Sequence, residues 1–450
     1  NPIKVSAAYF CQDAFLNQLG VSPTFNLLTS VMDDMRPENK YLHLMDEQEA
    51  ITKAQALLNR PGDANVSPLA VYRHAAKADS VQQRRPNVVL IMMESMSAKF
   101  MKHFGQSETL TPFLDSLYTR SISFRNFYSA GIHTNHGLYA TLYSFPAMMK
   151  RNLMKGSVIP RYSGLPTVLK ENGYYNLFFM THEGQYDNMN AFFRTNGYDE
   201  VFSQEDYPAD KVVNSFGVQD DFLYDYAIPV LNQRAATGQP FFATLLSISN
   251  HPPYVIPPFF HPKTSEPEMQ IVEYADWALR QFFEEARKQP WFDNTIFVLE
   301  GDHGKLVGDA ECELPESYNH IPLMIYSSRI QPEEKTAFGG QVDIQPTILG
   351  LLNIDYLQNN FGVDLLKEER PCMFYTADNM VVGRNDTLLY LYNYETQQEL
   401  TYDIGNGKLN AVPMDDSFLP LKEYSFSMLQ SAEFLVKHGK TLNSIPFTQQ

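Results

Sequence analysis

The feature that most constrains the fold is a series of short apolar runs, each the length of one buried strand. The run Asn87–Met93 (NVVLIMM) is apolar after its first residue and leads directly into Glu94 and Ser95. An unbroken apolar run rich in branched residues is typical of a strand buried on both faces, as in parallel sheets covered by helices. Ligands bind at the carboxyl ends of such strands in open α/β sheets, so Glu94 is the first candidate site residue.

Similar runs recur along the chain, and several of them also end near polar side chains. They are Asn176–Met180 before His182, Phe241–Ile248 before His251, Thr295–Leu299 before Asp302 and His303, and Pro322–Tyr326. Helix-like segments such as Leu165–Asn172 and Val272–Arg287 lie between them. Strands that alternate with helices predict an α/β fold with a doubly wound, mostly parallel sheet flanked by helices.

The chain divides into three predicted parts. These are an N-terminal helical arm or linker (1–80), a catalytic α/β domain (81–370) and a small C-terminal subdomain (371–450). In the arm, Asp46–Asn59 has the spacing of a helix that stops before Pro61 and Gly62. The C-terminal part predicts an antiparallel sheet plus a helix, with strands at Leu388–Tyr394 and Glu399–Ile404 and a helix over Phe418–Lys437.

Composition excludes several classes of protein. With 35 basic and 52 acidic residues the net charge is −17, which argues against nucleic-acid binding through phosphate contacts. The three cysteines form no CxxC pair, so a zinc ribbon or a thioredoxin-like site is not expected. No apolar run approaches the length of a membrane span. The chain begins at Asn1, and we expect a trimmed protein whose N-terminal membrane anchor is missing.

The residue types at the strand ends are those that bind divalent metal ions. Carboxylate and imidazole groups suit Mn²⁺, Mg²⁺ or Zn²⁺. Asp302 and His303 lie between Gly301 and Gly304, and glycines allow a sharp turn that would bring both side chains to one site. From these residues alone the pair fits a metal site and a plain turn equally well, and Glu94 alone is more often the start of a helix.

A second segment, Gly131–Gly137 (GIHTNHG), leads from a loop into a helical pattern. Thr134 falls near the predicted N-terminus of this helix, where free N–H groups and the helix dipole favour anions. The same position fits a helix N-cap, which is the favoured interpretation from the segment alone.

Several motifs occur in a characteristic order. They are Asn87–Ser95 (NVVLIMMES), Gly131–Thr141 (GIHTNHGLYAT), Ala191–Tyr198 (AFFRTNGY), Ser249–Tyr254 (SNHPPY), Tyr274–Asp276 (YAD), Gly301–Gly304 (GDHG) and Val342–Leu349 (VDIQPTIL). Together they resemble the extracytoplasmic domain of lipoteichoic acid synthases and phosphoglycerol transferases, in the alkaline phosphatase/sulfatase superfamily. The resemblance covers about residues 84–400, and the arm at Asn1–Ser30 is similar to the linker that follows the membrane helices of that family.

The resemblance implies roles for individual residues. It implies one metal ion, Mn²⁺ above Mg²⁺ or Zn²⁺, held by Glu94, Thr134, Asp302 and His303, with Thr134 as the nucleophile. It further implies that Arg194, His251 and Asp187 bind the phosphate and glycerol of the substrate.

The chain departs from the family pattern at two places. Where lipoteichoic acid synthases have His-Gly-Asp, it has Gly184–Met189 (GQYDNM), and Phe192 replaces the family tryptophan. These changes resemble Gram-negative members and leave the acceptor open. The sulfatase signature Cys-x-Pro-x-Arg follows none of Cys11, Cys312 or Cys372, which disfavours a formylglycine sulfatase.

The implied function is transfer of phosphoglycerol from a phosphatidylglycerol-type lipid, through a phosphoglyceryl-threonine, to a hydroxyl acceptor. The acceptor is a glycan, a polymer or water, and the implied location is the extracytoplasmic face of a bacterial inner membrane. A phosphodiesterase or phosphoethanolamine transferase with the same site remains an alternative. A catalytically silent binding module is a third alternative, although all four metal-site residues are present.

Overall fold

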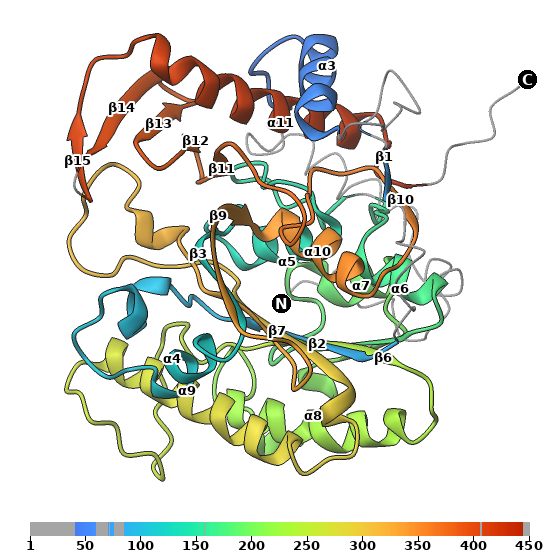
Figure 1. Ribbon diagram of the computed structural model, residues 1–450. Helices are drawn as coiled ribbons and strands as arrows, with labels where there is room; N and C mark the ends of the chain where they lie inside the picture. Colours follow the sequence, from blue (N-terminus) through green and yellow to red (C-terminus); the bar gives the residue numbers. More distant parts are fainter. Residues whose placement is uncertain are drawn as a thin grey trace, which may run out of the picture.

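The computed structural model describes residues 41–59, 71, 73–75, 85–156, 158–405 and 407–443. Its centre is an eight-stranded sheet (Figure 1). In spatial order the strands are β5 (Glu200–Phe202), β4 (Tyr175–Phe179), β6 (Phe241–Leu246), β2 (Asn87–Met93), β7 (Thr295–Gly301), β8 (Leu323–Tyr326), β3 (Ile122–Tyr128) and β9 (Glu333–Gly340). Within this sheet β8 runs antiparallel to both neighbours, and every other pair is parallel.

Helices cover both faces of this sheet (Figure 1). One face carries α5 (Thr134–Tyr143), α6 (Leu165–Glu171), α7 (Met189–Thr195) and α10 (Ile344–Leu351), and the other carries α4 (Pro112–Tyr118), α8 (Asp220–Ala235) and α9 (Pro267–Ala286). Side chains of β2 alternate between the two cores: Val88 and Leu90 pack on the α5 side, and Val89 and Ile91 on the α9 side. Because both faces are buried, the strand needs apolar residues at successive positions, which explains its unbroken apolar sequence.

A smaller antiparallel sheet lies against the α5 side of the domain (Figure 1). Its strands in order are β11 (Met373–Thr376), β12 (Met380–Arg384), β13 (Leu388–Asn393), β14 (Gln398–Gly405) and β15 (Lys408–Ala411). Helix α11 (Leu419–Lys437) packs on this sheet, and α3 (Glu47–Leu58) of the N-terminal arm packs on α11. Strands β1 (Arg73–Ala75) and β10 (Tyr356–Gln358) pair to form a separate two-stranded antiparallel ribbon.

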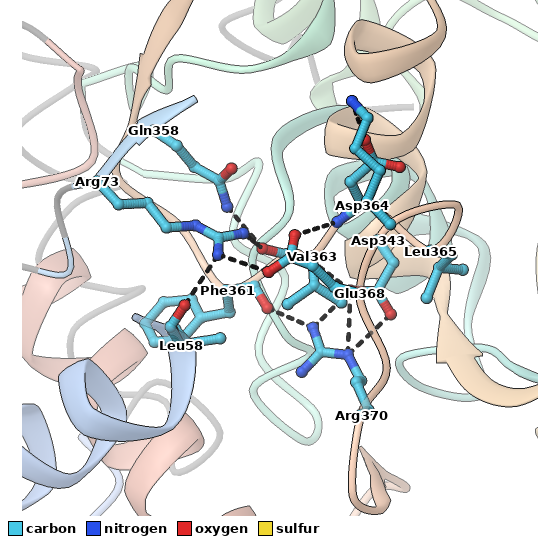
Figure 2. A network of polar contacts seen from close by, with 12 residues as sticks. Leu58, Arg73, Asp343, Gln358, Phe361, Val363, Asp364, Leu365, Glu368 and Arg370 are labelled. Atoms are coloured by element: carbon cyan, nitrogen blue, oxygen red, sulfur yellow. Dashed lines mark hydrogen bonds and ion pairs between the residues drawn. The ribbon is translucent and has the colours of Figure 1, made fainter. Parts of the chain in front are cut away.

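A buried polar network connects the two parts (Figure 2). Arg370 lies between Asp343, which precedes α10, and Tyr424 of α11, and its guanidinium donates hydrogen bonds to both. Figure 2 shows the contact with Asp343. A second buried ion pair joins Arg151 to Glu433 of α11 at 3.0 Å. These contacts hold the small subdomain in one orientation on the eight-stranded sheet.

The predicted fold class is confirmed: the sheet is mostly parallel and flanked by helices, and the C-terminal part is a separate antiparallel sheet with a helix. The predicted helix over Val272–Arg287 begins earlier, at Pro267. Strands β3 and β9 were not predicted. The domain boundaries stay predictions, and the arm at Asn1–Ser30 lies outside the described residues. In the described part of the chain no helix is both long and apolar enough to cross a membrane.

Candidate active site

Three side chains of the types that can bind a metal ion converge at the carboxyl ends of two adjacent strands. Glu94 follows β2, and Asp302 and His303 follow β7. Each of the three offers one ligand atom, and these atoms all lie within 4.8 Å of one another. Glu94 is 1% exposed and Asp302 is fully buried. Adjacent parallel strands therefore bring together residues that are far apart in the sequence.

Hydrogen bonds fix the two carboxylates in place. Ser95 has a left-handed backbone (φ 50°), which is uncommon for a residue other than glycine. This conformation lets the Ser95 amide donate to Asp302 Oδ1 at 2.8 Å, while its hydroxyl donates to Glu94 Oε1 at 2.7 Å. The amide of His303 also donates to Asp302 Oδ1, at 2.7 Å. The other oxygen, Asp302 Oδ2, is buried without a hydrogen-bond partner in the described structure.

The imidazole of His303 is oriented for coordination. Its Nδ1 lies 2.7 Å from the Gly304 carbonyl oxygen, so Nδ1 carries the proton and donates it. Its Nε2 then has a free lone pair, 3.6 Å from Asp302 Oδ2 and 3.9 Å from Glu94 Oε1. A backbone carbonyl that fixes the tautomer in this way is the usual support for a metal-binding histidine.

The buried carboxylates of the site would be stabilised by a nearby cation. Burial and the nearby charge of Asp302 raise the pKa of Glu94 well above its ordinary value. Two buried carboxylates that face one another repel unless a positive charge lies between them. The unpartnered Asp302 Oδ2, the free Nε2 of His303 and the two carboxylates form an O/N donor set that fits a divalent metal ion.

Thr134 lies at the edge of this cluster. Its hydroxyl donates to Glu94 Oε2 at 3.5 Å, and it is the first residue of α5. The N-cap of α5 is His133, so the interpretation of Thr134 as a helix cap is wrong. Helix α5 approaches the Asp302 loop closely at Gly137, where an added Cβ would lie 2.3 Å from the Asp302 carbonyl oxygen. That close approach brings the start of α5, where Thr134 lies, beside Asp302.

The glycines around Asp302 and His303 act differently from the expectation. Neither Gly301 nor Gly304 has a left-handed backbone, so they do not provide a special turn. Instead, a Cβ at Gly304 would lie 2.0 Å from the Ser317 carbonyl oxygen. The motif needs glycine there because another part of the backbone packs against it.

The other predicted site residues lie in three different places. Asp187 accepts a hydrogen bond from Asn135, the neighbour of Thr134, at 3.3 Å, and it pairs with Lys155 at 2.7 Å. Asp187 therefore lies on the Thr134 side. His251 follows β6 and packs against Phe216, with ring centroids 4.0 Å apart and the ring planes tilted by 42°.

Arg194 contacts its own helix and the sheet edge. Its Nε donates to Asn190 at 2.7 Å and its Nη2 donates to the Val201 carbonyl at 3.3 Å. These contacts place it beside α7 and β5 rather than among the four clustered residues. His182 is buried, and desolvation lowers its pKa, so it is a neutral packed side chain. Phe192 is buried in the core near Tyr143.

Sequence reasoning assigned no role to three residues that complete the site: Ser95, Asn250 and Lys305. Asn250 donates to the Ser95 carbonyl at 3.0 Å, and Lys305 donates to Asn250 Oδ1 at 2.7 Å. Each lies directly beside a residue that was singled out: Glu94, His251 or the GDHG motif. Their positions next to these motifs were the sequence signal that could have identified them as site residues.

Comparisons with known proteins agree with this geometry. The sulfatase family profile matches residues 86–354. Lipoteichoic acid synthase 1 of Bacillus subtilis is 25% identical over 350 residues, which is 72% of this chain and 53% of that protein. Lipoteichoic acid synthase 2 of the same organism is 24% identical over 63% of this chain and 47% of that protein. The chain thus spans about half the length of these curated relatives.

Solved structures show the same fold. An alkaline phosphatase superfamily protein from Vibrio parahaemolyticus aligns with a TM-score of 0.79 and 26% identity, over 91% of this chain and all of that one. A lipoteichoic acid synthase from Listeria monocytogenes aligns with a TM-score of 0.68 and 21% identity, over 79% of this chain and 93% of that one. The chain therefore belongs to the sulfatase family of the alkaline phosphatase superfamily and is a distant relative of the lipoteichoic acid synthases.

Proposed function

We propose that the protein is a metal-dependent phosphoglycerol transferase that acts on a phosphatidylglycerol-type lipid. The observation that carries the proposal is the position of Thr134. Its hydroxyl lies 3.5 Å from Glu94, at the start of a ten-residue helix and beside a cluster of metal-ligand atoms. A hydroxyl in this setting is placed to attack an anionic phosphorus centre, because the helix N-terminus favours the negative charge.

Glu94, Asp302 and His303, with the Thr134 oxygen as a fourth ligand, would hold one divalent ion. Mn²⁺ is the expected metal, and Mg²⁺ or Zn²⁺ are the alternatives. When bound, the ion supplies positive charge that makes the Thr134 hydroxyl more acidic and offsets charge on the phosphoryl oxygens. The protein contributes a fixed donor set, because the hydrogen bond that Ser95 donates to Asp302 and the one that the Gly304 carbonyl accepts from His303 leave little freedom to reorganise.

The reaction has two balanced steps. In the first, a bond forms between Thr134 Oγ and phosphorus, the bond from phosphorus to the diacylglycerol oxygen breaks, and the hydroxyl proton passes to that leaving oxygen. The product is phosphoglyceryl-Thr134. In the second, an acceptor hydroxyl attacks the same phosphorus, the bond to Thr134 Oγ breaks, and the acceptor proton returns to Thr134. Such transfers depend mainly on positioning and on electrostatic stabilisation.

We assign the surrounding residues to the head group. Arg194 has a planar fork suited to phosphate oxygens, and His251 and Asp187 can hydrogen-bond glycerol hydroxyls. The acceptor is a glycan, a lipid-linked polymer or water. This chemistry requires contact with lipid, so we place the protein at the extracytoplasmic face of a bacterial inner membrane, held by an N-terminal anchor.

The same cluster would also support a phosphodiesterase or a phosphoethanolamine transferase, which differ in acceptor or head group. A sulfatase is disfavoured because Thr134 stands where the nucleophile is expected and no formylglycine signature is present. A silent binding module is disfavoured because the ligand atoms and Thr134 are assembled together.

The test is incubation of the Mn²⁺-loaded protein with phosphatidylglycerol labelled in the head-group glycerol. Intact mass and peptide mapping should show one phosphoglycerol on Thr134, with release of diacylglycerol. Thr134→Ala is the negative variant, and Thr119→Ala, at an exposed helix end, is the matched control. Modification by phosphatidylethanolamine but not phosphatidylglycerol would favour the phosphoethanolamine alternative. Absence of any adduct and of any lipid cleavage would contradict transferase and phosphodiesterase alike.

A further inference from the structure

Lys305, the residue after the GDHG motif, extends across the site from the β7 loop to the β6 loop. Its ammonium donates to Asn250 Oδ1 at 2.7 Å and to the Tyr254 hydroxyl at 3.1 Å. The ring centroids of Tyr254 and Phe100 lie 4.9 and 5.3 Å from Nζ. Two neutral acceptors and two aromatic faces therefore hold the ammonium in one place.

This cation has no partner carboxylate within ion-pair distance among the described residues. Its hydrogen bonds go to an amide and a phenol, which carry no charge. A half-buried ammonium without a carboxylate partner is costly to keep, and such groups are typical of binding sites rather than of structural cores.

Among the described residues, two of the three ammonium N–H groups of Lys305 have an acceptor and the third has none. It also ties Lys305 to the metal ligands: Asn250 accepts from Lys305 and donates to the carbonyl of Ser95, and Ser95 hydrogen-bonds both Glu94 and Asp302. The position of the ammonium is thus set by the same loops that set the donor cluster.

The positive charge of Lys305 matters for the charge balance of the site. With a divalent ion bound, the carboxylates of Glu94 and Asp302 would supply two negative charges, which cancel the two positive charges of the ion. The cluster alone therefore offers no net positive charge to a phosphodiester anion. In a protein of net charge −17, that charge has to come from individual side chains close to the site.

We propose that Lys305, oriented by Asn250 and Tyr254, binds a non-bridging phosphate oxygen of the substrate. The proposal rests on the function proposed above, because it assigns the anion-binding part of that substrate site. Lys305 would bind the substrate anion before the reaction and hold it during transfer. Its ammonium would do so beside the metal ligands, where the β6 loop meets the site.

The test measures binding without turnover. The probe is sn-glycerol 1-phosphate, titrated by calorimetry into Mn²⁺-loaded wild type, Lys305→Met, Tyr254→Phe and the control Lys288→Met. Lys288 is an exposed lysine paired with Glu285. Metal content and melting temperature are measured for each variant, so that loss of metal or misfolding is recognised.

We expect Lys305→Met to raise the Kd for glycerol phosphate about tenfold or more, since a charge-assisted hydrogen bond is lost. Tyr254→Phe keeps the aromatic face but loses one orienting hydrogen bond, so its effect should be smaller and in the same direction. Lys288→Met should bind as wild type does.

The proposal is overturned if Lys305→Met, with normal metal content, binds glycerol phosphate as tightly as wild type. It is also overturned if the wild type does not bind the probe. The outcome for the proposed function can be told apart from the outcome for this inference. If phosphatidylglycerol modifies Thr134 but Lys305→Met binds glycerol phosphate as tightly as wild type, this inference is contradicted and the proposed function is not. Binding that depends on Lys305, without any Thr134 adduct, supports the anion subsite and contradicts the transferase.

Discussion

Arg370 and Asp343 form a buried ion pair at the junction between the catalytic sheet and the C-terminal subdomain (Figure 2). Their side chains are 1% and 0% exposed. Asp343 also accepts from the backbone amides of Gly340 at 2.9 Å and Val363 at 2.8 Å. Arg370 donates to Tyr424 of α11 at 2.6 Å. The aspartate of the motif VDIQPTIL therefore acts as a structural centre for the domain junction.

Removing one partner of this pair should strongly destabilise the protein. Arg370→Met leaves the Asp343 carboxylate buried without its cation, which costs about 3–5 kcal/mol in the free energy of unfolding. Urea denaturation followed by circular dichroism measures it. The control is Lys150→Gln, which breaks the exposed pair with Glu395 across the same junction and should cost less than about 1 kcal/mol. Equal costs for the two variants would contradict the structural role.

Much of the fold could be predicted because strands buried on both faces are mostly apolar along their length. Strands β2, β4, β6 and β7 are of this kind. Strand β9 could not be recognised, because it lies at the sheet edge and its first residues, from Glu333, are mostly charged and exposed. Strand β3 was obscured by Arg125 and Asn126 in its interior.

The site was predictable in its parts but not in its assembly. Glu94, Asp302 and His303 were recognisable from their places at strand ends. That β2 and β7 are neighbours depends on strand order, which no local pattern specifies. The contacts of Lys305 depend on two loops that meet only in the folded protein, so residue type and spacing alone could not reveal them.

The metal site can be tested by removing one carboxylate. Asp302→Ala should lose most of the bound metal, because Asp302 supplies one of two anionic ligands and its Oδ2 has no other partner. Metal content of the purified protein, by mass spectrometry, is the measurement. Asp378→Asn is the control, since Asp378 pairs with His133 near Thr134 but is outside the donor cluster. Full metal content in Asp302→Ala would rule out this ligand set.

Thr134→Ala should abolish turnover and keep the fold. Thr134 is not the cap of α5, and the removed hydroxyl makes one long hydrogen bond, so the melting temperature should change little. The rate of phosphatidylglycerol cleavage should fall at least about a thousandfold, as expected for loss of a nucleophile. Thr134→Ser, which restores a hydroxyl, should recover part of the rate. Near-normal cleavage by Thr134→Ala would assign the attack to water.

His251 should contribute to recognition of the glycerol. Its Nδ1 donates to the Pro252 carbonyl at 2.6 Å, which leaves Nε2 as an acceptor for a substrate hydroxyl. His251→Ala should lower kcat/KM for phosphatidylglycerol about two- to tenfold, the value of one hydrogen bond. Phosphatidylmethanol, which has no free head-group hydroxyl, should be cleaved equally by variant and wild type. An equal loss on both lipids would show that the histidine supports the loop instead.

Arg194 should be sensitive even to a conservative change. A guanidinium binds two phosphate oxygens with a planar fork, and lysine cannot reproduce that geometry. Arg194→Ala and Arg194→Lys should therefore both lower the rate on phosphatidylglycerol, with only partial recovery in the lysine variant. The same assays on an aryl phosphodiester separate phosphate binding from head-group binding. Wild-type rates for both variants on both substrates would mean that Arg194 serves only α7 and β5.

The stability of the helix layer that contains α4 and α9 should depend on pH. Asp276 of α9 accepts hydrogen bonds from the amides of Phe113 and Leu114 at 2.9 Å each, and so closes the N-terminus of α4. Burial raises the pKa of Asp276 to about 7, with Asp115 acting in the same direction and the amides and Arg280 opposing.

A folded-state pKa of about 7 exceeds the value of about 4 in the unfolded chain. Asp276 therefore binds a proton more tightly in the folded protein, and its contribution to stability is complete below pH 4 and is lost as the pH rises to about 7. Asp276→Asn lacks this contribution. The difference in free energy of unfolding between wild type and Asp276→Asn should decrease from acidic to neutral pH and level off above it, in urea titrations across that range. A difference that grows with pH would show that the two amides keep the carboxylate ionised in spite of its burial.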